Sequence, residues 1–213
     1  MIFGGLEAAL NLLFPPKCPF CGEILPRPGL CGRCGADFPG DYWWQGEFLC
    51  AAPLRYEGAV RECLLRFKFH GDPSLAEPLG ALMAECAQRR YGQDFDAVTW
   101  VPVSPRRRRK RGYDQAELLA KALCRTWGGM RPRRLLRKIR ENAVQSGLKD
   151  PAQRLRNVRD VYVPAFRLEN FPRRVLLVDD ICTTGATLGE CRRVLLANGV
   201  EEAACIAAAL AGE

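Results

Sequence analysis

Two adjacent acids followed by a loop of hydroxyls form the most distinctive chemical pattern in this sequence. The stretch VLLVDDICTTGAT (Val175–Thr187) places Asp179 and Asp180 directly after four apolar residues, and a loop rich in Thr and Gly follows at once. Carboxylates accept hydrogen bonds from the vicinal hydroxyls of a sugar, whereas the N–H groups of a helix N-terminus favour a phosphate. The pattern therefore predicts a site for a ribose 5-phosphate.

The loop after the acids is expected to hold the phosphate. Thr183, Thr184 and Thr187 add hydroxyl donors, and Gly185 lets the backbone approach a ligand closely. Each of these residue types also occurs in ordinary turns. The complete thirteen-residue string favours the phosphate interpretation over simple turn chemistry.

Four cysteines near the N-terminus have the spacing of a metal site. The pattern is C-x2-C, nine intervening residues and a second C-x2-C, formed by Cys18, Cys21, Cys31 and Cys34. Each pair can wrap one side of a tetrahedral zinc ion, and the glycines that follow, Gly22 and Gly35, allow tight turns that aim N–H groups at sulfur. The segment is rich in Pro and Gly, so it needs a stabilising element other than a core. We predict a structural zinc site, with buried free cysteines as the alternative.

Positive charge is concentrated in one part of the chain. Residues 106–160 hold 18 of the 32 Lys and Arg but only five of the 24 acids, a net charge of +13 against −5 for the rest. A charged run is often only a solvated surface. The stretch SPRRRRKRG is too dense for that interpretation, and it predicts residues that contact nucleic acid or pyrophosphate: Arg106, Arg107, Arg108, Arg109 and Arg111.

The elements that must position these residues follow from periodicity. Helices are expected at 59–69, 75–90, 116–127 and 187–199, and strands at 49–58, 96–104, 133–140, 174–180 and 201–211. Strands that alternate with helices predict an α/β fold with a mostly parallel sheet flanked by helices, whose ligands bind beyond the carboxyl ends of the strands. We expect a small N-terminal module, 1–50, with an amphipathic helix at 6–14, and one main domain, 51–213.

The remaining features exclude other classes of protein. No apolar run approaches the ~20 residues needed to span a bilayer, so we expect no membrane span. Eleven cysteines without secretory features indicate thiols in a cytoplasmic protein. For Tyr42, Trp43 and Trp44 we favour core packing over base stacking, and for His70, the sole histidine, a structural role over a catalytic one.

The motifs together resemble a known family. VLLVDDICTTGAT is similar to the phosphoribosyl pyrophosphate (PRPP) signature of type I phosphoribosyltransferases. With CPFCG…CGRCG, VPVSPRRRRKRGYDQAELLAKAL and QSGLKDPAQRLRNV, it resembles the ComF family of competence-associated, phosphoribosyltransferase-like proteins over nearly the whole chain. The resemblance implies a type I phosphoribosyltransferase-like fold with an N-terminal zinc module.

The resemblance also implies roles for individual residues. The PRPP-binding residues would be Val103 and Ser104 in a pyrophosphate loop, Asp179 and Asp180 at the ribose hydroxyls with a catalytic role in any transfer, and Thr183, Thr184, Gly185, Ala186 and Thr187 at the 5-phosphate. Residues 145–157 would form a loop that closes over the ligand. Mg²⁺ is expected to accompany PRPP.

Two function classes remain open at this point. The family resemblance implies DNA uptake in natural transformation, with single-stranded DNA and DNA-uptake machinery proteins as partners. The alternative is a metabolic phosphoribosyltransferase that moves ribose 5-phosphate from PRPP to an unidentified acceptor. Purine phosphoribosyltransferases carry an acid where this chain has Thr183, and a threonine does not titrate near neutral pH.

Overall fold

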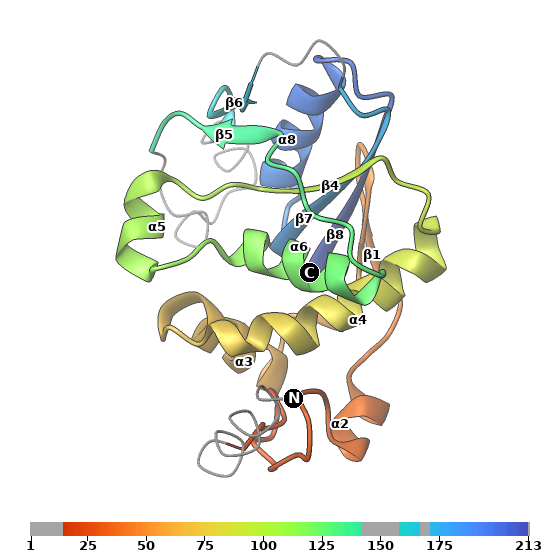
Figure 1. Cartoon of the computed structure of the whole chain (residues 1–213), viewed down its shortest axis with the longest axis vertical. Helices are drawn as coiled ribbons and strands as arrows, with labels where there is room; N and C mark the ends of the chain where they lie inside the picture. Colours follow the sequence, from red (N-terminus) through yellow and green to blue (C-terminus); the bar gives the residue numbers. More distant parts are fainter. Residues whose placement is uncertain (1–14, 142–157, 167–170, 213) are drawn as a thin grey trace, which may run out of the picture.

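The computed structural model describes residues 15–141, 158–166 and 171–212 (Figure 1). Two expectations, the amphipathic helix at 6–14 and the closing loop at 145–157, therefore lie outside the described residues.

A mostly parallel sheet forms the centre of the molecule. Its strand order is β1-β2-β8-β7-β4, and only the pairing of β1 with β2 is antiparallel. The strands are β1 (Tyr42–Gln45), β2 (Leu49–Ala52), β4 (Ala97–Trp100), β7 (Arg174–Cys182) and β8 (Glu202–Leu210), and the short β3 (Leu54–Arg55) also pairs with β8. The predicted α/β class and its mostly parallel sheet are confirmed.

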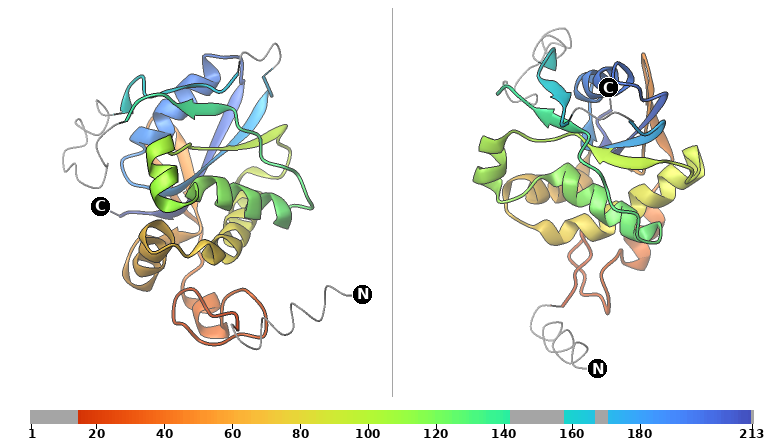
Figure 2. Two further views of the ribbon diagram at one scale, coloured as in Figure 1. Left: turned by 60° about the vertical axis from the view of Figure 1, so that its left-hand side comes forward. Right: turned by 45° about the horizontal axis from the view of Figure 1, so that its top comes forward.

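Helices cover both faces of this sheet (Figures 1 and 2). Leu176, Val178 and Ile206 belong to the core that includes α3 (Gly58–Phe69), α4 (Ala76–Tyr91) and α6 (Gln115–Thr126), while Leu177 and Cys205 belong to the core with α8 (Ala186–Leu196). Neighbouring residues of one strand point to opposite faces, so an apolar run such as VLLV serves both cores at once. A short 3₁₀-helix, η1 (Pro73–Leu75), precedes α4.

The strand expected at 133–140 forms, but it does not join the main sheet. It is β5 (Leu136–Lys138), which pairs antiparallel with β6 (Tyr162–Pro164). In Figure 1 this pair lies above α5 (Pro105–Arg111) and beside α8.

The Arg-rich stretch forms helix α5. Ser104 caps the N-terminus of this helix, and Gly112 ends it in the left-handed conformation with φ of 85°.

The segment 15–38, which carries the four paired cysteines, lies below α3 (Figure 2). It contains the short helix α2 (Gly32–Asp37), and the guanidinium of Arg66 on α3 donates a hydrogen bond to the carbonyl of Pro19. β2 spans residue 50, the boundary expected between the two domains, and both β1 and β2 belong to the main sheet.

The aromatic cluster and the unpaired cysteines show where side chains pack. Tyr42 and Trp44 lie against the core that includes α8, as expected, whereas Trp43 is half exposed, with the Arg90 guanidinium 4.5 Å from its ring centre.

All seven cysteines without paired spacing are buried: Cys50, Cys63, Cys86, Cys124, Cys182, Cys191 and Cys205. Among the described residues, no helix is long and apolar enough to cross a membrane.

Candidate functional site

A cavity of about 380 Å³ opens at the carboxyl ends of β4 and β7. Its wall includes residues 101–103 after β4, residues 179–188 at the end of β7 and the start of α8, and side chains from α3, α5, β5 and β6. The size falls within the roughly 300–1,000 Å³ range of small-molecule sites. The structure therefore brings the acids, the hydroxyl loop and part of the basic segment to one place.

The two acids have different surroundings. The Asp179 carboxylate accepts a hydrogen bond from the N–H of Asp180 at 2.8 Å, whereas the Asp180 carboxylate pairs with the Lys68 ammonium of α3 at 2.8 Å. Burial, and then the charge of Asp180, raises the pKa of Asp179 well above its ordinary value. The two acids therefore differ, because burial opposes the charge of Asp179 whereas Asp180 is ion-paired.

The loop after these acids leads into a helix N-terminus, as predicted. Gly185 is the N-cap residue of α8, with φ of 68°, a left-handed conformation that favours glycine. Thr183 is exposed, Thr184 and Thr187 are partly buried, and all three line the cavity. The ring of Trp44 packs so closely on this loop that a Cβ at position 185 would lie 2.5 Å from it. The packing of Trp44 and the left-handed backbone therefore both favour glycine at position 185.

Backbone contacts fix the loop after β4, where a pyrophosphate loop was expected. The N–H of Val103 donates to the buried Asp114 carboxylate at 3.0 Å, and the Ser104 hydroxyl accepts from the N–H of Arg107 at 3.3 Å. Val103 lines the cavity, whereas Ser104 is buried as a helix cap. These contacts hold the loop in one conformation but occupy two of its polar groups.

The arginine side chains of helix α5 point in different directions. Arg107 and Arg111, four residues apart on one face, line the cavity. Arg108 pairs with Glu117 at 3.4 Å, and Arg106 and Arg109 are exposed. The pKa of Arg111 is lowered because burial disfavours its charge. Two arginines therefore face the cavity, and the others face solvent or α6.

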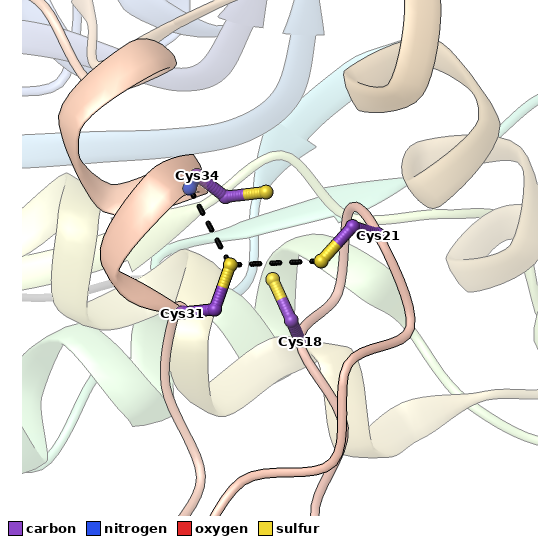
Figure 3. A group of neighbouring side chains, drawn as sticks. All are labelled: Cys18, Cys21, Cys31 and Cys34. Atoms are coloured by element: carbon purple, nitrogen blue, oxygen red, sulfur yellow. Dashed lines mark hydrogen bonds between the residues drawn. The ribbon is translucent and has the colours of Figure 1, made fainter.

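The four paired cysteines also come together (Figure 3). Their sulfur atoms all lie within 4.8 Å of one another, with Cys21 and Cys31 3.5 Å apart and the N–H of Cys34 3.4 Å from the Cys31 sulfur. Gly22 makes a turn with φ of 77°, but Gly35 lies inside α2, so the second pair uses the first turn of a helix instead of a glycine turn. The donor set fits a structural zinc ion.

The thiols of this cluster do not ionise equally without a metal. Although burial opposes ionisation of Cys18, hydrogen bonds from the backbone N–H groups of Cys31, Cys21 and Phe20 lower its pKa to about 6. Burial and the neighbouring thiols raise the pKa of Cys34. Four negative charges so close together repel one another, and a divalent cation at the centre would remove that repulsion.

Comparison with known proteins identifies the family. No family model matches the chain. Competence protein F of Haemophilus influenzae is 30% identical over 93% of this chain and 90% of its own length. DNA utilization protein YhgH of Escherichia coli K12 is 32% identical over 85% of this chain and 78% of its own length. Competence protein ComFC of Bacillus subtilis is 28% identical over 85% of this chain and 72% of its own length.

The chain belongs to the ComF family. Several residues of this ComF cavity were missed from the sequence. Lys68 and Arg61 lie on the cavity face of α3, and their seven-residue spacing on an expected helix was the available signal. Lys138 of β5 gave no such signal, because its position depends on how the β5–β6 pair folds over the cavity. Burial, and then Arg107, lowers the pKa of Lys138 to about 8.

Proposed function

We propose that this ComF protein binds a phosphorylated ribose, PRPP or ribose 5-phosphate, in its cavity, and that it acts in DNA uptake by handling single-stranded DNA. The supporting observation is that Asp179 and Asp180 line the same cavity as the hydroxyl loop 183–187 and the inward-facing arginines of α5. The loop would hold the 5-phosphate, the acids would face the ribose hydroxyls, and Arg107 and Arg111 would offset pyrophosphate charge.

The role in DNA uptake is supported by the relatives. Two carry the name of competence proteins and one that of a DNA utilization protein. The exposed side of α5 adds physical support, since Arg106, Arg109 and Lys110 are available to a phosphate backbone outside the cavity. DNA-uptake machinery proteins are the candidate protein partners.

Transfer to a purine is the less favoured use of this cavity. A transferase needs a group that handles the acceptor's proton, and Thr183 cannot titrate near neutral pH. Among the described residues of the cavity wall, the only carboxylates are Asp179 and Asp180, one of which pairs with Lys68. Mg²⁺ would enter with the pyrophosphate of PRPP, and the two acids offer the oxygen ligands that it prefers.

Calorimetric titration with PRPP, with and without Mg²⁺, tests the ligand. The variant Thr183→Ala/Thr184→Ala removes two hydroxyls from the cavity wall without altering Gly185. A hydrogen bond to a charged group contributes about 1.5–3 kcal/mol, so each lost bond should weaken binding at least about tenfold. Thr126→Ala is the matched control, because its hydroxyl donates to the Ala122 carbonyl within α6 and Thr126 does not line the cavity.

The proposal predicts that the parent protein and Thr126→Ala bind PRPP equally and that the double variant binds it weakly. Equal PRPP affinity for all three proteins would show that the phosphate lies elsewhere. A steady release of pyrophosphate with a common nucleobase, abolished in Asp179→Asn/Asp180→Asn, would instead support the metabolic transferase.

A further inference from the structure

The mouth of the cavity carries features that a phosphorylated ribose alone does not use. Phe69, the last residue of α3, lines the cavity yet has 56% of its surface exposed. The Arg111 guanidinium lies 5.2 Å from the centre of its ring. An aromatic ring on a positively charged rim is the usual platform on which a base of single-stranded nucleic acid stacks.

This platform is held in place by the neighbouring helix junction. The Tyr113 hydroxyl donates to the carbonyl of Phe67, and the Gln115 amide donates to the carbonyl of Lys68 at 3.5 Å. The Gln115 side chain also accepts from Arg111 at 3.0 Å. The ring, the guanidinium and the end of α3 thus form one connected wall.

The sugar end of the cavity also carries a cation next to its acids. Lys68 reaches Asp180 at 2.8 Å, so one of the two carboxylates expected at the ribose hydroxyls is already paired. The second oxygen of that carboxylate can still accept a hydrogen bond from a ribose hydroxyl. In a DNA strand the 3′-oxygen instead carries the next phosphate, which needs a cation at this point, and Arg61 on the same face of α3 adds a second one.

A path for further phosphates continues outside the cavity. Arg107 and Arg111 face inward from α5, while Arg106, Arg109 and Lys110 of the same helix are exposed to solvent. A volume of about 380 Å³ suits one nucleotide rather than several. The rest of a strand must therefore leave through the mouth and pass these cations.

We propose that the cavity binds the 5′-terminal nucleotide of a single DNA strand. The terminal phosphate lies on the loop 183–187, the base stacks on Phe69, and Lys68 pairs with the phosphate that follows. This inference rests on the proposed function, because it uses the same phosphate loop, and it adds that the protein recognises an end of the strand.

Fluorescence anisotropy with three oligonucleotides of one sequence tests the inference. The first carries a 5′-phosphate, the second a 5′-hydroxyl and the third a 3′-phosphate, and each has an internal dye. We expect the first to bind at least about tenfold more tightly than the other two, as one additional charge-assisted phosphate site requires. Thr183→Ala/Thr184→Ala should reduce that difference, because it removes two hydroxyls from the proposed phosphate loop.

The stacking part is tested with Phe69→Ala. It should weaken binding of the 5′-phosphorylated strand, whereas the control Phe166→Ala should not, because Phe166 is also exposed, at 62%, but does not line this cavity. PRPP should displace the 5′-phosphorylated strand.

Equal affinity for the three strands, or no competition by PRPP, would overturn the end recognition. Calorimetry with PRPP separates this failure from that of the proposed function: PRPP binding without an end preference leaves the proposed function standing and removes only this inference.

Discussion

The loop that is proposed to bind phosphate should be sensitive to a single methyl group at Gly185. Gly185 has φ of 68°, and a Cβ there would lie 2.5 Å from the ring of Trp44. An alanine in the left-handed region costs about 1–2 kcal/mol, and forcing a side chain into a packed contact costs about 1–3 kcal/mol. Gly185→Ala should therefore lower the free energy of unfolding by about 2–5 kcal/mol.

The control for this prediction is Gly46→Ala. A Cβ at position 46 would meet the same Trp44 ring at 2.4 Å, but Gly46 does not have a positive φ. Gly46→Ala should lower the free energy of unfolding by the cost of the packing contact alone, about 1–3 kcal/mol. Replacing Trp44 with Leu in the Gly185→Ala background should restore the stability lost through the contact with the ring. The cost of the left-handed backbone at position 185 should remain.

Urea unfolding of the four proteins measures these differences. A Gly185→Ala variant as stable as the parent would refute the packing of Trp44 on the loop. A cost no larger than that of Gly46→Ala would refute the left-handed requirement. A bulky residue at position 185 would disturb the loop even without a ligand.

Three further predictions follow from the same structure. Purified protein should contain one zinc ion per chain by elemental analysis, and Cys18→Ser/Cys31→Ser should lose it and melt at a lower temperature; a zinc content near zero in the parent would contradict the site. The affinity for pyrophosphate should rise as the pH falls from about 9 to about 7, because a bound anion favours the charged form of Lys138, whose pKa is about 8; Lys138→Arg should flatten the profile, and an unchanged profile would exclude Lys138. Replacing Arg106, Arg109 and Lys110 with Ala should reduce the slope of log affinity for single-stranded DNA against log salt by about 2, roughly 0.7 for each phosphate that the variant no longer neutralises; an unchanged slope would rule out the exposed side of α5.

The sequence predicted the central strands and the metal cluster because these depend on local patterns. The run VLLVDD contains both the buried strand and the acids at its end, so the place of Asp179 follows from the strand alone. Likewise, two C-x2-C pairs bring four sulfurs together almost independently of the remaining fold.

Residues brought to the site by long-range packing could not be predicted in this way. Lys68 pairs with Asp180 across 112 positions of sequence, and Trp44 reaches Gly185 from the far edge strand of the sheet. The stretch after Pro105 carried a charge signal but too few apolar residues to reveal a helix, so the inward direction of Arg107 and Arg111 required the structure.

The most direct test of the proposed ligand site is a crystal structure of the protein with PRPP and Mg²⁺. The account predicts a 5-phosphate within about 3 Å of the backbone N–H groups of loop 183–187, with the ribose hydroxyls next to Asp179 and Asp180. PRPP bound on the outer side of α5, or a cavity that stays empty at saturating PRPP, would contradict it.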